Sequence, residues 1–294
     1  MKIRIGTRKS QLAMTQAKSI AEILNEAGLE TELVAVSTKG DQFQHLPIDR
    51  VGKNGVFVGE LESALTSGHV DVAVHSLKDM PSLLPEGYLL APPPTSPDVR
   101  DVIVGKAPLK NEEDLAKMTI ATGSNRRRSQ LLHFYPGVSI EPIRGNIQTR
   151  IEKMKASHAD GTILAYAGLQ RADLTHLISG ILDPTRFIPS PSQGLLGIEI
   201  SEERHDLLQI FKEVSDPYAN FRMKVERKYQ RALDASCHSP IGIYIEKKNK
   251  TDILLHGCFA KDGKSPLRYA TVSSTFHTAE DDVLKLVQEV KGHD

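Results

Sequence analysis

The sequence predicts an α/β fold in which two α/β domains surround a cleft and a small α+β domain follows them. Three observations support this. Strand and helix patterns alternate over residues 2–200, proline-rich connectors occupy residues 91–97 and 184–194, and the pattern changes after residue 218. A chain of 294 residues fits two or three domains. Because the chain leaves one domain at the first connector and returns at the second, we expect two lobes.

The first domain is expected to begin with a short strand and a capped helix. Ser10 can cap a helix over residues 11–27, and Gly28 can end it. The other elements expected here are strands at residues 2–6, 32–37 and 71–75 and a helix near residues 58–67. This βαβ order implies a parallel sheet that is covered by helices.

The second α/β domain and the C-terminal domain follow with different patterns. The second domain is expected to contain strands at residues 101–104, 118–121, 139–142 and 162–165 and helices at about 126–134 and 147–157. The C-terminal domain is expected to contain one charged helix, strands at 241–246, 253–260 and 268–274, and a final helix around 280–290. The predicted domains are residues 1–95 with 196–216, residues 96–195, and residues 217–294.

The charge balance excludes a protein that coats nucleic acid or membrane by its overall field. Lys+Arg and Asp+Glu both number 37, so the formal net charge is zero and any anion site must be local. No stretch approaches the roughly 20 apolar residues of a membrane-spanning helix. No apolar run follows the basic residues near the start, so we expect no signal peptide and a cytoplasmic location. The two cysteines do not make a disulfide framework.

Cations follow two predicted strand ends in the first domain. Arg8 and Ser10 lie where the first strand gives way to a helix, and free N–H groups there favour an anion. Lys78 and Asp79 follow the strand at 71–75. In open α/β sheets this edge faces the ligand crevice, where such a carboxylate can act as a general acid or base. Each pair taken alone would more often be an ordinary solvated turn.

The same theme recurs in the second domain. Ser124 precedes Arg126 and Arg127 at a predicted helix start, where the cations oppose the helix dipole and call for a bound anion. Arg144 and Arg150 flank a third turn, in which Gly145 permits close backbone approach. Arginine-rich strand ends in both lobes predict a polyanionic small molecule as ligand. A wider basic stripe with stacking aromatics is lacking, so we expect no nucleic-acid partner.

Cys237 lies in a turn of small residues between the charged helix and the C-terminal strands. Nearby cations favour the thiolate, so such a cysteine can serve as nucleophile or covalent anchor. The alternative is that it is a small buried hydrophobe, as most lone cysteines are. His256 and Cys258 share one face of a strand, but the spacing around Cys237 and His238 is not that of metal ligands, and we expect no metal site.

These residues resemble the hydroxymethylbilane synthase, or porphobilinogen deaminase, family of tetrapyrrole biosynthesis. The resemblance extends almost from end to end and rests on ordered motifs at residues 6–10, 74–81, 124–127, 144–150, 167–171 and 237–242. It implies three domains, the first two built like type II periplasmic binding proteins and the third carrying the cofactor cysteine. It also implies a monomeric cytoplasmic transferase of porphyrin and heme biosynthesis.

The resemblance also implies roles for individual residues. Cys237 is expected to hold a dipyrromethane cofactor through a thioether, which primes the stepwise condensation of four porphobilinogen molecules. Ammonia leaves each substrate, and water finally releases hydroxymethylbilane. Asp79, with Lys78, is expected to be catalytic, stabilising an azafulvene-like cation and shuttling protons. The implied cofactor-binding residues are Cys237, Arg126, Arg127, Ser124, Lys78, Asp79 and Arg144, and the implied substrate-binding residues are Arg8, Ser10, Arg144, Arg150 and Arg171.

The sequence departs from the family pattern at several positions. Asn54 and Gly59 stand where the family commonly has lysine, Ser192 stands where a glycine is usual, and Ala235-Ser236 replaces a Gly-Gly pair. These changes leave two alternatives open. One is a divergent paralogue that binds a tetrapyrrole or other polycarboxylate without efficient elongation, and the other is a transferase acting on a related pyrrole with changed chain length.

Overall fold

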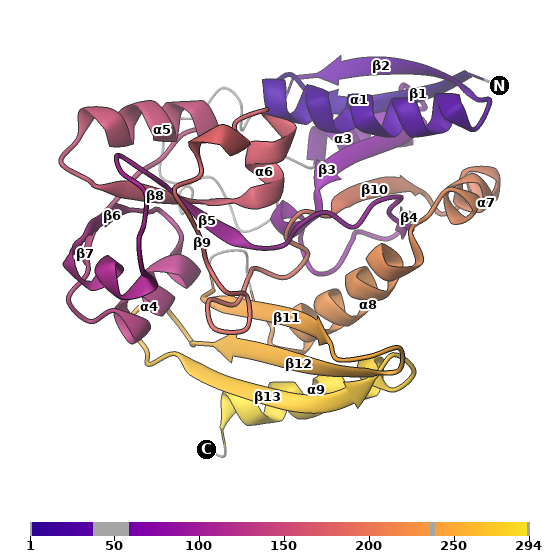
Figure 1. Ribbon diagram of the computed structural model, residues 1–294. Coiled ribbons are helices and arrows are strands. Elements are labelled where there is room, and N and C mark those ends of the chain that lie inside the picture. The colour runs from indigo at the N-terminus through magenta and orange to yellow at the C-terminus, as the bar shows by residue number, and fades with distance from the viewer. Residues whose placement is uncertain (1, 38–58, 236–238, 293–294) are drawn as a thin grey trace. The chain divides into compact units, whose positions relative to one another are not determined.

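The computed structural model describes residues 2–37, 59–235 and 239–292 (Figure 1). The described chain divides into two compact units. Unit 1 comprises Met1–Pro97 with Gly194–Met223, and unit 2 comprises Asp98–Gln193 with Lys224–Asp294. None of the helices in these described ranges is long and apolar enough to cross a membrane.

Unit 1 is built on a five-stranded mixed sheet. Its strand order is β2 (Glu30–Val36), β1 (Lys2–Arg8), β3 (Val72–Ser76), β10 (Leu196–Ser201) and β4 (Tyr88–Ala91). β1 runs parallel to β2 and β3, whereas β10 runs antiparallel to β3 and β4. The carboxyl ends of β1, β2 and β3 therefore meet at one edge of the sheet.

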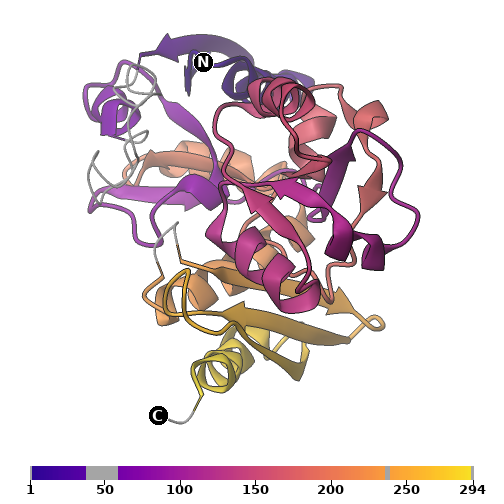
Figure 2. The ribbon, with the colours of Figure 1, turned by 90° about the vertical axis from the view of Figure 1, so that its left-hand side faces the viewer.

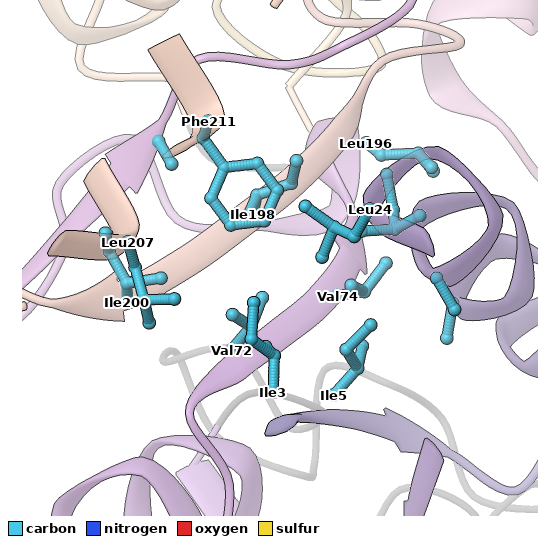
Figure 3. Close-up of a cluster of buried hydrophobic side chains, with 14 residues drawn as sticks. Ile3, Ile5, Leu24, Val72, Val74, Leu196, Ile198, Ile200, Leu207 and Phe211 are labelled. Carbon is cyan, nitrogen blue, oxygen red and sulfur yellow. The ribbon is translucent and has the colours of Figure 1, made fainter. Parts of the chain in front are cut away.

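Helices cover both faces of this sheet. On one face, α1 (Gln11–Glu26) and α7 (His205–Glu213) bury Leu24, Leu207 and Phe211 against the strands (Figure 3). The buried positions of α1 recur every three or four residues, which is the spacing of one helix face. On the other face lie α3 (Gly59–Thr66) and a second apolar cluster. The result is a three-layer α/β arrangement.

The first sheet of unit 2 repeats this topology. Its order is β7 (Ser139–Glu141), β6 (Thr119–Ala121), β8 (Gly161–Ala165), β5 (Asp101–Gly105) and β9 (Gly180–Ile181). β6 is parallel to β7 and β8, and β5 is antiparallel to β8 and β9. Here too, three parallel strands end at a shared edge.

Helices again lie on both faces. α5 (Ile147–Ala156) and α6 (Tyr166–Arg171) pack on the face that contains Val102 and Val104. α4 (Asn125–Phe134) and the 3-10 helix η3 (Glu112–Lys117) pack on the face that contains Ile103. Successive strand residues thus enter opposite cores, as the two-residue period of a strand requires. A further 3-10 turn, η4, spans Thr175–Leu177.

The C-terminal part of unit 2 forms an antiparallel sheet in the order β11 (Ile241–Lys247), β12 (Asp252–Phe259) and β13 (Arg268–Thr275). α9 (Ala279–Lys291) packs on one face of this sheet (Figure 2). α8 (Pro217–Ala232) crosses from unit 1 into unit 2, and its buried Tyr229 donates a hydrogen bond to the Cys258 carbonyl oxygen, 3.1 Å away.

The predicted α/β fold class is confirmed, including the small C-terminal sheet with its helices. β4 and β9 were not predicted, because both are short and pair only with strands distant in sequence, such as Ala91 with Ile198. The boundaries 1–95 with 196–216, 96–195 and 217–294 remain a prediction, as does the arrangement of the lobes around a cleft. Asn54, one of the departures from the family pattern, lies outside the described residues.

The unit 1 core gives a stability prediction. Phe211 is fully buried in the cluster with α1 and β10, so Phe211→Ala should lower the free energy of unfolding by about 3–5 kcal/mol. Leu83 is 70% exposed, and Leu83→Ala should change it by less than about 0.5 kcal/mol. Urea unfolding followed by circular dichroism measures both variants. Equal stability of the two variants would contradict this packing.

Candidate active site

The predicted site residues of unit 1 lie beyond the carboxyl ends of two neighbouring parallel strands. β1 pairs with β3 so that Ile5 faces Val72 and Gly6 faces Ala73. Arg8 ends β1, and the turn that carries Lys78 and Asp79 follows β3. The sheet register therefore brings these two polar turns to the same edge of unit 1, as the sequence predicted.

Ser10 positions the turn after β1 by capping α1. Its hydroxyl accepts a hydrogen bond from the Ala13 backbone N–H at 3.4 Å, and Thr7 donates to the Ala13 carbonyl oxygen at 3.0 Å. Arg8 is half-buried and Lys9 is exposed. A capping hydroxyl that accepts a bond still has its own hydrogen to donate, so Ser10 can also bind a ligand oxygen.

A short 3-10 turn, η2 (Leu77–Asp79), holds Asp79 outward. Leu77 and Met80, on either side of Lys78 and Asp79, are each 1% exposed. The Leu77 backbone N–H also donates to the Leu195 carbonyl oxygen at 3.1 Å. Lys78 is half-buried and Asp79 is exposed. Two buried anchors thus fix a solvent-accessible carboxylate at the strand end.

A buried His75–Glu199 pair joins β10 to β3, the strand that leads into this turn. Nε2 of His75 lies 3.0 Å from Oε2 of Glu199, and the side chains are 6% and 0% exposed. Burial, together with the charge of Glu199, raises the pKa of the nearby Glu62 carboxyl. The sequence analysis missed this pair. Its only signal was a polar residue within each of two otherwise apolar strands, which lie far apart in the chain.

In unit 2, the turn after β6 approaches the turn after β7. Ser124 caps α4 by accepting a hydrogen bond from the Arg127 backbone N–H at 3.4 Å. A Cβ atom at Gly123 would lie 2.6 Å from the Ile143 carbonyl oxygen and 4.0 Å from Cγ of Arg144. Glycine at this position therefore allows the Ser124 and Arg144 turns to lie against one another.

Arg126 and Arg127 share one buried carboxylate. Nη2 of Arg126 lies 2.7 Å from Oδ2 of Asp101, and Nη2 of Arg127 lies 2.8 Å from Oδ1. Their Nη1 atoms donate to the carbonyl oxygens of Ile188 and Ile163, each at 2.7 Å. Both arginines are 5% exposed and Asp101 is fully buried. Two of the cations thus point into the protein rather than into solvent.

The position of Asp101 follows from antiparallel pairing. Asp101 opens β5 and faces Ala165, the last residue of β8, so it lies at the edge where the parallel strands end. The sequence predicted a bound anion at the start of α4. For Arg126 and Arg127, the anion in contact is the carboxylate of Asp101, which belongs to the protein itself. The role of Arg126 and Arg127 in cofactor binding remains a prediction, and their observed contacts position α4.

Arg144 and Arg150 extend the cationic edge. Gly145 has a φ of 126°, which favours glycine, and its carbonyl oxygen accepts a hydrogen bond from Nε of Arg150 at 2.7 Å. Asn146 caps α5 by accepting from the Thr149 backbone N–H at 2.8 Å. Arg144 is exposed, whereas Arg150 is half-buried. This turn therefore presents at least one guanidinium group to solvent.

Arg171 ends α6, the helix that follows β8. Its side chain is partly buried, and burial lowers the pKa of its guanidinium to about 10. The group is still charged at neutral pH. Desolvation makes it a stronger partner for a ligand carboxylate than a fully hydrated arginine would be.

Cys237 lies outside the described residues, but the residues around it are placed. α8 ends before Asp234, which has a φ of 50°, and the backbone N–H of buried Ala235 donates to the Gln230 carbonyl oxygen at 3.3 Å. On the other side, the Pro240 carbonyl oxygen accepts a hydrogen bond from the Ala260 N–H at 3.0 Å. The anchor assignment of Cys237 remains a prediction.

Cys258 is buried in the protein, and both ring nitrogens of His256 contact other side chains. Cys258 is fully buried, and burial raises the pKa of its thiol to about 12, so this thiol stays protonated at neutral pH. His256 lies 2.9 Å from Oε2 of Glu246 and 3.1 Å from Oγ1 of Thr271 through its two ring nitrogens. Across the described parts of the chain, no cluster of three metal-ligating side chains occurs.

The buried ion pairs of Asp101 with Arg126 and Arg127 predict that the stability of the fold falls at low pH. Burial alone would raise the pKa of Asp101, but the guanidinium charges and hydrogen bonds of Arg126 and Arg127 hold it well below its usual range. Its stabilising contribution is therefore complete above the unfolded pKa of about 3.9 and is lost as the pH falls below that value. Asp101→Asn should lower the free energy of unfolding at pH 7 by about 3–5 kcal/mol and flatten the acid limb.

The matched control is Glu86→Gln, which removes an exposed carboxylate of unit 1. Its free energy of unfolding should stay within about 0.5 kcal/mol of the parent value. Urea unfolding from pH 7 to pH 2 measures both variants. If Asp101→Asn keeps the parent stability at pH 7, the buried ion pair does not hold α4 in place.

Comparisons of the sequence with known proteins agree on one family. The sequence profile described as "Porphobilinogen deaminase, dipyromethane cofactor binding domain" matches residues 3–209. Porphobilinogen deaminase of Clostridium botulinum strain Hall is 39% identical over 267 residues, covering 90% of this chain and 91% of the relative. That of Clostridium novyi strain NT is 35% identical over 286 residues, covering 95% of each.

Further matches include the porphobilinogen deaminase of Bacillus pumilus, which is 38% identical over 277 residues, or 93% of this chain and 89% of the relative. Among solved structures, the periplasmic VFT2 domain of Bordetella pertussis BvgS aligns with a TM-score of 0.44 and 15% identity, covering 77% of this chain and 92% of that one. The profile covers more than half of the chain, and the identity of the relatives extends over nearly all of it. This chain belongs to the porphobilinogen deaminase family.

Proposed function

We propose that this protein is a hydroxymethylbilane synthase, a transferase that joins four porphobilinogen molecules head to tail and releases ammonia from each. The observation that carries this proposal is family membership over about nine tenths of the chain, with the motif residues kept in order. Asp79 and the strand-end cations of both units are present, and Cys237 is the only other cysteine besides Cys258. The final product is hydroxymethylbilane, released by water.

The side chains at the strand ends fit the acid groups of a dipyrromethane cofactor. Each pyrrole carries two carboxylates, and the described edges offer an exposed Arg144, a partly exposed Lys78 and the capping hydroxyl of Ser124. These residues would hold the cofactor that Cys237 anchors. When bound, the cofactor supplies a primer pyrrole with a free α-carbon for the first condensation.

Asp79 would carry the central electrostatic role. Porphobilinogen loses ammonia as the bond between its methylene carbon and nitrogen breaks, and positive charge then spreads over its pyrrole ring. An accessible carboxylate on a fixed turn can stabilise that charge and take up the pyrrole proton afterwards. The buried Leu77 and Met80 keep Asp79 in place for this task. Lys78, on the same turn, would bind an acid side chain of the substrate.

The remaining cations would bind the incoming substrate. Arg8 and Ser10 lie on the same edge of unit 1 as Asp79. In unit 2, Arg150 lies in the first turn of α5 and Arg171 ends α6. The carboxylates of porphobilinogen need several fixed cations, and guanidinium groups bind them with paired hydrogen bonds. We also propose that the protein acts as a monomer in the cytoplasm.

A second candidate function is binding of a tetrapyrrole or other polycarboxylate without elongation. The feature that favours it is the loss of two lysines common in the family, at Asn54 and Gly59. Both candidates need the cationic strand ends. Only the synthase needs a covalent primer and ammonia release, so the covalent state of Cys237 separates the two.

The anchor assignment gives the first functional prediction. Purified wild-type protein should be heavier than its polypeptide by one dipyrromethane and should react with Ehrlich's reagent, whereas Cys237→Ser should show the polypeptide mass and no colour. Cys258→Ser is the matched control, because it changes the buried cysteine and should keep the adduct. Intact-mass spectrometry reads all three. An adduct on Cys237→Ser would refute the anchor, and an unmodified wild type would favour the binding protein.

The proposed role of Asp79 gives the second prediction. Asp79→Asn should keep the covalent adduct and substrate binding but lower kcat by about 100- to 10,000-fold, because a neutral amide neither stabilises the cation nor takes up its proton. Glu203→Gln, which changes another exposed carboxylate of unit 1, should keep wild-type turnover. Product formation from porphobilinogen measures both. Turnover of Asp79→Asn near the wild-type level would remove Asp79 from the mechanism.

A further inference from the structure

The hairpin turn between β12 and β13 presents two lysines on a rigid support. Oδ1 of Asp262 accepts hydrogen bonds from the backbone N–H groups of Lys264 and Ser265, at 2.8 and 2.7 Å, and from the Ser265 hydroxyl at 2.9 Å. An aspartate that bonds its own following backbone in this way closes a tight turn. Lys261 and Lys264 lie on either side of Asp262, and both are exposed.

One end of this turn is tied to the chain next to the predicted cofactor anchor. Ala260, which precedes Lys261, donates its backbone N–H to the Pro240 carbonyl oxygen at 3.0 Å. Pro240 is three residues beyond Cys237 in the sequence. The Ile241 N–H in turn donates to the Ser239 carbonyl oxygen at 2.8 Å. Lys261 therefore follows directly from a residue bonded to the described flank of the anchor segment.

The other part of the turn lies against the start of α4. A Cβ atom at Gly263 would lie 3.5 Å from both Cγ and Oδ1 of Asn125, which is ordinary contact distance. Asn125 is the first residue of α4, and Ser124 caps this helix. Within unit 2, the turn that carries Lys261 and Lys264 thus contacts the start of α4, where residues that bind acid groups are predicted. Neither contact was visible in the sequence.

The charges of this region favour a carboxylate ligand. Lys261 and Lys264 form no salt bridge within 4.0 Å in the described ranges, and Asp262 supplies the one acid of the turn. Its carboxylate is already bonded to the turn's own N–H groups, which lower its pKa, and the charge of Lys264 contributes to this lowering. The neighbouring Ser124 and Asn125 are neutral. The turn therefore carries a net positive charge beside hydrogen-bonding groups.

We propose that Lys261 and Lys264 are additional binding residues for the acetate and propionate groups of the growing oligopyrrole. This inference rests on the proposed synthase function and extends it to the C-terminal sheet. Lysines suit this task because their long side chains move a point charge over several ångströms, so that they can follow a chain that changes position at each addition. The rigid guanidinium groups at the strand ends would fix one pyrrole ring of the oligopyrrole. The lysines would hold the rings that are added after it.

The test compares three double variants of the holoenzyme. Lys261→Ala/Lys264→Ala removes both charges, Lys261→Arg/Lys264→Arg keeps them, and Lys110→Ala/Lys250→Ala removes two exposed lysines elsewhere in unit 2. For exposed pairs of this kind, we expect the first variant to raise KM for porphobilinogen about 3- to 10-fold, with kcat within about 2-fold of wild type. Native mass spectrometry of enzyme with limiting substrate should also show fewer long intermediates in that variant alone.

Two outcomes would overturn the inference while the proposed function stands. One is a KM and intermediate distribution for Lys261→Ala/Lys264→Ala that match Lys110→Ala/Lys250→Ala. The other is an equal loss in the arginine variant, which would show that charge is not the cause. A wild-type protein with neither adduct nor turnover is a separate result, which overturns the proposed function and this inference with it.

Discussion

The carboxylate of Asp101 is the constraint on which the candidate site of unit 2 depends. It lies fully buried between Arg126 and Arg127 and accepts hydrogen bonds from both guanidinium groups, so that its single negative charge offsets one of the two buried positive charges. Those arginines belong to the first turn of α4, so the ion pair fixes that turn against β5 and β8. Ser124 and Asn125 occupy the same helix start. The proposed ligand binding at this helix start would therefore depend on a buried ion pair within the protein.

The polar groups at the strand ends of the two five-stranded sheets are held in position by different contacts. In each, three parallel strands end at one edge, and polar turns follow them. In unit 1, the buried neighbours Leu77 and Met80 hold an exposed Asp79 outward, and the buried His75–Glu199 pair joins the preceding strand to β10. In unit 2, a buried ion pair holds the helix while Arg144 remains exposed. The exposed Asp79 and Arg144 can contact a ligand, and the buried side chains keep the turns that carry them in position.

The sequence was sufficient to predict the features that depend on local pattern. Ser10 as a helix cap, the strand ends and the α/β class all follow from residue types and spacing within a few positions. Asp101 and the His75–Glu199 pair could not be predicted, because their partners are 25 or more residues away and meet only through antiparallel pairing of β5 and β10. The burial of Arg126 was also missed, because arginine clusters usually face solvent.

The proposed chemistry requires that cations at the strand ends hold the carboxylates of porphobilinogen while this substrate loses ammonia. The most direct measurement follows ammonia and tetrapyrrole together when the purified wild-type protein is mixed with porphobilinogen. Both should appear, with four ammonia molecules for each hydroxymethylbilane. Substrate binding without release of ammonia would contradict it.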